Sequence, residues 1–180
     1  MQNTDFKRIG RRLFQEGLVG GNFGNMSVRT EYGYMITRSG SYLDEPGDLI
    51  TVITGEETPE SASSEYRVHE AIYQRTEHSA VVHAHPSSAV AASLLMDRIN
   101  PIDSEGLMLC PEITVVSGAP GTTELAENVA IALHEAKLVI ARGHGTFAAG
   151  KTLDEAYLYT SLADHSARVL FYTGQFNAEK

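Results

Sequence analysis

Two histidines at the end of an apolar run are the first residues whose spacing points to chemistry. His83 and His85 lie in the stretch VVHAHP, separated by one alanine. Because side chains of a β-strand repeat their direction at every second residue, both imidazoles would project from the same face of a strand. This spacing allows both rings to reach one metal ion. Taken alone, it fits equally well two histidines tolerated in a small core.

A third histidine lies between two glycines in the stretch ARGHGTF. The glycines on either side of His144 allow a sharp backbone turn and leave its imidazole unobstructed, although a loop histidine in water fits the same pattern. Three neutral imidazoles would leave the 2+ charge of an ion intact and one coordination position open, as in catalytic zinc sites. Four other histidines are weaker candidates: His69, His78, His134 and His165.

A carboxylate near such an ion would complete a reactive site. Glu65 follows Ser63 and Ser64 at the start of a predicted helix. A carboxylate beside a metal can move a proton as a general acid or base. A glutamate at a helix start is also favoured by the helix dipole without any chemical role, so both interpretations stay open.

The elements that must position these residues alternate along the chain. Apolar residues at helical spacing and short apolar runs bounded by turn residues predict helices and strands, respectively. The predicted helices cover residues 6–14, 65–75, 86–96, 121–136 and 152–172, and the predicted strands lie within 26–30, 34–38, 49–53, 79–85, 112–117 and, as a pair joined by a turn, 137–150. Thr152 and Glu155 have capping-box spacing at the start of the last helix. This alternation predicts a single layered α/β domain over residues 1–180, with a mixed, largely antiparallel sheet flanked by helices.

Composition excludes several classes of protein. The 180 residues include 14 basic and 23 acidic side chains, a net charge of -9 that argues against a general nucleic-acid surface. Cys110 is the only cysteine, so no intrachain disulfide can form, as is typical of a reducing compartment. No apolar run approaches the ~18 residues of a membrane span, and the N-terminal stretch lacks the apolar core of a secretion signal. We therefore expect a cytoplasmic protein without nucleic-acid or membrane partners.

Five separated motifs, in the same order, resemble the class II aldolase/adducin family, and most of all its L-fuculose-1-phosphate aldolase branch. They are GNFGNMSVR, ITRSG, SSEYRVHEAIY, AVVHAHP and ARGHGTFAAGKTLDEAY, and the resemblance extends over roughly residues 6–172. It implies that His83, His85 and His144 bind one Zn²⁺ per subunit. It also implies that Glu65 is the acid/base residue and can ligate the free metal.

The same resemblance implies a site for the phosphate group of a sugar. Its members would offer backbone N–H groups, hydroxyls and a side-chain amide, which are neutral donors suited to an anion in an acidic protein. The residues implied are Gly24, Asn25, Ser39, Gly40, Ser63 and Ser64, with Asn22 as a further candidate.

The activity implied is that of a zinc-dependent aldolase, a lyase that reversibly cleaves a ketose 1-phosphate such as L-fuculose 1-phosphate into dihydroxyacetone phosphate and an aldehyde. The family also implies a homo-oligomer, a tetramer with its sites near subunit interfaces. Methylthioribulose-1-phosphate dehydratase remains an alternative, as does a sugar-phosphate 4-epimerase, although epimerases have aspartate where this chain has Glu65. An alternative of another class is a non-catalytic, adducin-like binding module.

The chain departs from the fuculose-phosphate branch at its proton-donating tyrosines. In that branch a tyrosine from a neighbouring subunit follows the His-x-His helix, whereas the approximate match here is Ser104. Asp103 or Glu105 can substitute for it, or both are ordinary surface acids. A second tyrosine of that branch lies in a tail that would extend beyond Tyr172. These departures leave the identity of the sugar open.

Overall fold

The computed structural model of the chain, which describes residues 2–174, contains eight strands and six helices within that range. The strands are β1 (Asn25–Arg29), β2 (Gly33–Thr37), β3 (Leu49–Ile53), β4 (Ala80–Ala84), β5 (Arg98–Ile99), β6 (Ile113–Val116), β7 (Leu138–Ala141) and β8 (Gly145–Gly150). The helices are α1 (Gln2–Gln15), α2 (Tyr66–Arg75), α3 (Ser87–Leu95), α4 (Ser104–Leu109), α5 (Thr123–Glu135) and α6 (Leu153–Tyr172).

The strands form one sheet in the order β3-β2-β1-β4-β8-β7-β6-β5. Within residues 2–174 every neighbouring pair is antiparallel except β6 and β7, which run parallel across the crossover that contains α5. The predicted mixed, largely antiparallel α/β sheet is therefore confirmed.

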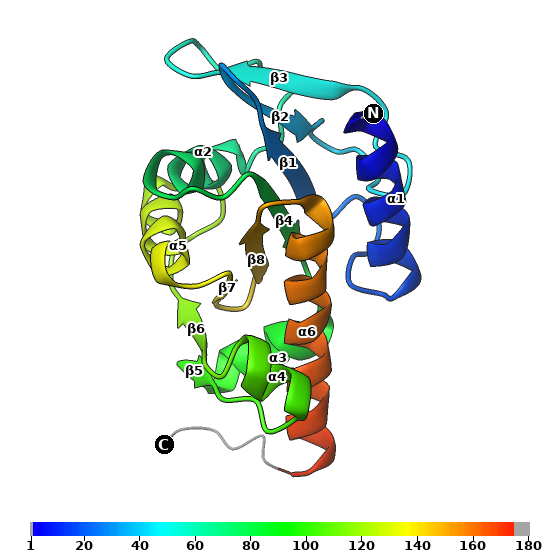
Figure 1. The fold of residues 1–180 in the computed structure, drawn as a ribbon, viewed down its shortest axis with the longest axis vertical. Coiled ribbons are helices and arrows are strands. Elements are labelled where there is room, and N and C mark those ends of the chain that lie inside the picture. The colour runs from blue at the N-terminus through cyan, green and yellow to red at the C-terminus, as the bar shows by residue number, and fades with distance from the viewer. Residues whose placement is uncertain (1, 175–180) are drawn as a thin grey trace.

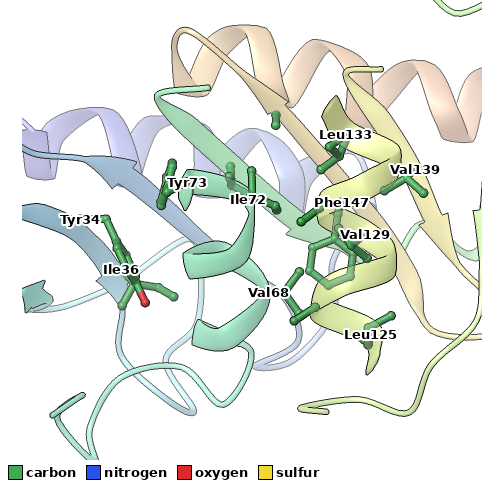
Figure 2. Close-up of a cluster of buried hydrophobic side chains, with 14 of the residues drawn as sticks. Tyr34, Ile36, Val68, Ile72, Tyr73, Leu125, Val129, Leu133, Val139 and Phe147 are labelled. Carbon is green, nitrogen blue, oxygen red and sulfur yellow. The ribbon is translucent and has the colours of Figure 1, made fainter. Parts of the chain in front are cut away.

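Helices cover both faces of the sheet (Figure 1). Along β4, Val81 packs into the apolar cluster beneath α2 and α5, which Figure 2 shows in close-up, whereas Val82 and Ala84 pack on the opposite side, towards α1 and α6. Since His83 has the same parity as Val81, its ring lies on the face covered by α2 and α5.

The last helix begins as its sequence predicts, with one difference. The Thr152 hydroxyl accepts a hydrogen bond from the backbone N–H of Glu155, at 3.2 Å. The Glu155 carboxylate accepts from the backbone N–H of Lys151 instead of returning to that of Thr152. The Glu155 carboxylate of the capping box therefore binds the backbone N–H one residue before the expected one.

Two short elements were not predicted. Strand β5 has only two residues, too few for a periodic pattern. Helix α4 has six residues and begins behind Asp103, whose side chain accepts from the backbone N–H of Gly106. None of the helices described between residues 2 and 174 is long and apolar enough to cross a membrane.

Arg29 ties the C-terminal end of α2 to the sheet. From the end of β1, its guanidinium donates to the carbonyl oxygens of His78, Tyr73 and Thr76, at 3.0, 2.7 and 2.8 Å. A cation at the C-terminal end of a helix is also favoured by the helix dipole. Arg29 therefore fixes the helix that Glu65 precedes.

Replacing Arg29 tests this anchoring role. Arg29→Met keeps most of the apolar stem but removes the donors to three carbonyl oxygens, so we expect the free energy of unfolding to fall by about 2–3 kcal/mol. Chemical denaturation measures the change. The matched control is Arg11→Met at an exposed position of α1, expected to change stability by less than about 0.5 kcal/mol. Equal effects of the two substitutions would contradict the role of Arg29.

Candidate metal centre and active site

The three histidines singled out by their spacing meet at one point. His83 is in β4 and His85 follows that strand, while His144 lies in the turn between β7 and β8. One nitrogen of each ring lies within 4.8 Å of the corresponding nitrogens of the other two. Antiparallel pairing of β4 with β8 brings the turn beside the end of β4.

The glycines flanking His144 have different functions. Gly143 has φ +65°, and the turn is closed by a hydrogen bond from the His144 N–H to the Ala141 carbonyl oxygen at 3.0 Å. At Gly145, a Cβ would lie 2.3 Å from the Ala84 carbonyl oxygen and 3.1 Å from Cε1 of His83. The predicted turn at these glycines is present, and the second glycine also leaves room for the histidine rings.

The hydrogen bonds of His83 indicate which ring nitrogen is free to bind a cation. Its Nδ1 lies 2.9 Å from the Thr146 carbonyl oxygen, and because a carbonyl only accepts, Nδ1 carries the proton. In the neutral ring, Nε2 then presents a lone pair to Nε2 of His85, 2.9 Å away. A lone pair that faces a second imidazole nitrogen at this separation suits a shared cation.

Burial keeps all three imidazoles neutral. It lowers the pKa of His83 well below its ordinary value, that of His85 to about 4, and that of His144 below its ordinary value. Neutral imidazole is the form that ligates a metal. The Nδ1 atom of His144 is buried without a hydrogen-bond partner in the described part of the chain. The donor set therefore fits a divalent ion of the zinc type.

Glu65 is buried beside these histidines, with only 5% of its surface exposed. It immediately precedes α2, yet its carboxylate makes no capping hydrogen bond to that helix. Its Oε2 atom is buried without a hydrogen-bond partner among residues 2–174. Burial raises the pKa of Glu65, partly offset by the backbone N–H of Gly121. Glu65 therefore does not act as a side-chain cap of α2.

A cavity of about 230 Å³ gathers every residue predicted for the site. Its lining comprises Asn22, Phe23, Gly24, Asn25, Arg38, Ser39, Gly40, Ser63, Ser64, Glu65, His83, His85, Pro120 and His144. At Gly24, with φ +81°, a Cβ would lie 2.6 Å from the His83 carbonyl oxygen, so glycine brings this loop against the end of β4. The hydroxyl of Ser63 lies at 3.4 Å from the backbone N–H of Glu65, which donates to it.

Three lining residues were missed in the sequence. The Phe23 ring stacks on that of His85, with centroids 5.5 Å apart and an interplanar angle of 9°. Pro120 precedes Gly121 near Glu65. Arg38 brings a positive charge to a lining predicted from neutral donors alone, and its position directly before Ser39 in the ITRSG motif was the available signal.

The acids weighed as substitutes for the missing tyrosine lie elsewhere in the chain. Asp103 caps α4 through Gly106, and its Oδ2 lies 3.7 Å from Nε2 of His165. Ser104 and Glu105 form the first turn of that helix. None of the three lines the cavity described above. A role for them at the site of a neighbouring subunit stays a prediction.

Comparison with known proteins agrees with this geometry. A model of the class II aldolase and adducin N-terminal domain matches residues 5–171. The chain belongs to this family. Within the class II aldolases, an L-fuculose phosphate aldolase of Methanococcus maripaludis is 31% identical over 174 residues, which are 94% of this chain and 96% of that protein. The L-fuculose phosphate aldolase of Escherichia coli is 35% identical over 152 residues, 78% of this chain and 68% of that protein.

The fold of this class II aldolase family member also matches solved structures. The crystal structure of L-fuculose-1-phosphate aldolase from Thermus thermophilus superimposes with a TM-score of 0.92 at 39% identity. The match covers 96% of this chain and 94% of the other. The resemblance inferred from the five motifs is therefore confirmed.

The buried histidines predict a pH dependence of stability. Burial lowers the pKa of His69 to about 3 in the folded protein, whereas an unfolded histidine titrates near ~6.5. The unfolded chain therefore binds more protons below that pH, and the contribution of His69 to stability, present above it, is lost as the pH falls. Between pH 7 and pH 5 this loss is about 2 kcal/mol.

Denaturant unfolding of the metal-free protein at both pH values measures the effect. We expect His69→Gln to flatten the pH dependence by that amount. His134→Gln, which replaces a histidine whose side chain is 62% exposed, should leave it unchanged. An identical pH dependence of stability in the wild type and in His69→Gln would contradict the lowered pKa of His69.

Proposed function

We propose that this protein is a metal-dependent aldolase that reversibly cleaves a ketose 1-phosphate, with L-fuculose 1-phosphate as the leading substrate. The products would be dihydroxyacetone phosphate and an aldehyde. The observation that carries the proposal is the convergence on a single cavity of three neutral imidazoles and one buried carboxyl group with an unpaired oxygen. Membership of the class II aldolase family and the names of the relatives support it.

In this proposal His83, His85 and His144 hold the ion. A bound Zn²⁺ would act as a Lewis acid that stabilises negative charge on the oxygens of the substrate. Zinc as the metal, a homotetrameric assembly and a cytoplasmic location belong to the same proposal and rest on the family. A non-catalytic binding module has no use for a reactive carboxylate buried at the cost of an unmade hydrogen bond.

Glu65 is the residue proposed to move the proton. When the carbon–carbon bond breaks, the hydroxyl group of one half loses its proton to solvent and becomes the carbonyl of the aldehyde, while the electron pair of the broken bond stays on the phosphate-bearing half as an enediolate. The enediolate becomes dihydroxyacetone phosphate when a carbon atom takes up a proton. A carboxyl group whose pKa is raised by burial takes up a proton more readily than an exposed carboxyl group and can deliver it to that carbon. In the direction of synthesis the same carboxylate removes it.

The loops on the other side of the cavity are proposed to hold the phosphate. The loop that contains Asn22 and Gly24, just before β1, lies beside the turn after β2 that contains Ser39 and Gly40, since a Cβ on Gly40 would lie 3.8 Å from Nδ2 of Asn22. Ser63 and Ser64 complete the set of neutral donors. Arg38 adds the positive charge that these donors lack.

Glu65→Gln separates chemistry from metal binding. The substitution preserves size but removes the proton acceptor, so we expect a loss of turnover of ~10²-fold or more with metal content unchanged. Product analysis on a panel of ketose 1-phosphates, with and without chelator, measures the activity, and elemental analysis measures the metal.

Two comparisons make that result decisive. His83→Ala removes a proposed ligand and should lose metal and activity together. If Glu65 were only a charge near a helix terminus, Gln would alter stability by ~0.3–1 kcal/mol and leave turnover nearly intact. A zinc-loaded Glu65→Gln variant that cleaves its substrate at the wild-type rate would end this mechanism.

Arg38→Met tests the charge at the proposed phosphate site. Because the loss of one charge-assisted contact weakens binding of substrate and transition state alike, we expect KM to rise roughly tenfold with kcat little changed. Arg38→Lys should recover part of the affinity. Steady-state kinetics at low ionic strength gives both constants, and an unchanged KM in Arg38→Met would exclude this contact.

A further inference from the structure

A chain of four polar side chains runs from the cavity into the interior beneath α2. Nε2 of His69 lies 2.5 Å from Oδ1 of Asn25, and Nδ1 of the same ring lies 2.6 Å from Oγ of Ser27. The Ser27 hydroxyl lies 2.6 Å from that of Tyr73. Ser27 and His69 are fully buried, while Asn25 and Tyr73 are 5% and 7% exposed.

Secondary structure places these groups opposite one another. Asn25 and Ser27 are two positions apart in β1 and therefore project from the same face of the sheet. His69 and Tyr73 are four positions apart in α2, and Glu65 lies four residues before His69, so the three follow one side of the helix. His69 and Tyr73 therefore follow Glu65, the residue proposed to move the proton, along one side of α2.

Only one arrangement of protons satisfies all four groups. A carbonyl oxygen accepts and does not donate, so Nε2 of His69 carries the proton and Nδ1 accepts from the Ser27 hydroxyl. Ser27 in turn accepts from the Tyr73 hydroxyl. Burial lowers the pKa of His69 to about 3, which keeps the ring in this single neutral form.

If the four side chains donated their hydrogen bonds in the opposite direction, one proton would have no acceptor. If the Asn25 amide were turned around, each group along the chain would donate inward, and the Tyr73 hydroxyl would need a further acceptor. In the described part of the chain, the hydrogen-bond partner of that hydroxyl is Ser27. A buried donor left unpaired costs ~1–3 kcal/mol, which is enough to select the first arrangement.

The amide nitrogen of Asn25 is left facing the cavity. Asn25 lines the cavity, and its Nδ2 atom is not among the fully buried, unpaired atoms of residues 2–174. Its carbonyl oxygen is held on the inner side by His69. Two N–H donors are therefore presented where the phosphate loops converge.

We propose that His69 is a positioning residue that fixes the Asn25 side chain as a hydrogen-bond donor to an anionic substrate. The role rests on the proposed function, because it assumes a phosphate group in this cavity. A free asparagine amide can rotate by half a turn and present its oxygen, which would repel the anion. His69, itself held by Ser27 and Tyr73, prevents that rotation.

The first test reads the arrangement directly in the zinc-loaded wild-type protein. ¹⁵N NMR of the imidazole nitrogens distinguishes the two neutral tautomers and the cation. We expect His69 to be neutral with its proton on Nε2 at neutral pH. A proton on Nδ1, or a protonated ring, would overturn the proposal. Because this readout needs no substrate, it tests the orientation of the Asn25 amide even if the protein cleaves no ketose phosphate, so its failure and the failure of the proposed function are distinguishable.

The second test uses steady-state kinetics with a ketose 1-phosphate that the wild type cleaves. His69→Leu removes the donor to Asn25, and we expect KM to rise roughly tenfold with kcat and zinc content little changed. His69→Gln, whose side-chain amide can donate to Asn25, should restore part of the affinity. Ser27→Ala should act in the same direction as His69→Leu.

These variants also separate positioning from folding. A merely structural role would lower the amount of folded enzyme and hence the apparent kcat, without raising KM. An unchanged KM in a folded His69→Leu variant would contradict the proposal. If His69→Leu does not fold, the KM of Ser27→Ala and the tautomer in the wild type decide the question.

Discussion

The register in which β4 pairs with its two neighbours determines which side chains meet His83 at the centre of the sheet. Asn25 of β1 lies opposite His83 of β4, and His83 lies opposite Phe147 of β8. These three side chains form a row across one face of the sheet. Because side chains alternate, a slip of one residue would direct His83 towards α6 and away from α2. The apolar cluster of Figure 2 stabilises the observed register, since Phe147 belongs to it and stacks on the His83 ring with centroids 4.1 Å apart.

Buried polar groups near this row are of two kinds. In the series of side chains from Asn25 through His69 and Ser27 to Tyr73, each side chain is hydrogen-bonded to the next. These hydrogen bonds stabilise one conformation. Oε2 of Glu65 and Nδ1 of His144 are buried without partners among residues 2–174, at a cost of ~1–3 kcal/mol each. An unpaired buried atom is free to bind a ligand or exchange a proton. The contrast distinguishes the groups proposed to position Asn25 from the groups proposed to bind the metal or move a proton.

Local patterns in the sequence indicate the three histidines as candidate metal ligands and predict most of the helices and strands, because strand alternation and helix capping are local properties. Residues 49–53, for example, form β3 with the predicted bounds. The order of the strands and the parallel pairing of β6 with β7 depend instead on contacts between distant segments. Arg38 was overlooked because its place in the cavity depends on how β2 ends relative to the loop of Gly24. His69 was weighed only as a weaker metal ligand, since its partners in β1 lie more than forty residues away.

The distribution of charge reconciles an acidic protein with the anionic substrate that we propose for it. The chain has a net charge of -9, yet the cavity lining contains one arginine, three imidazoles and a single carboxylate whose pKa is raised. Neutral imidazoles do not reduce the charge of a bound divalent ion, so the ion would make the cavity locally positive. A protonated Glu65 would add no negative charge to oppose it. Burial, which keeps the imidazoles neutral and favours the protonated carboxyl, thus sets the sign of the field at the site against that of the whole molecule.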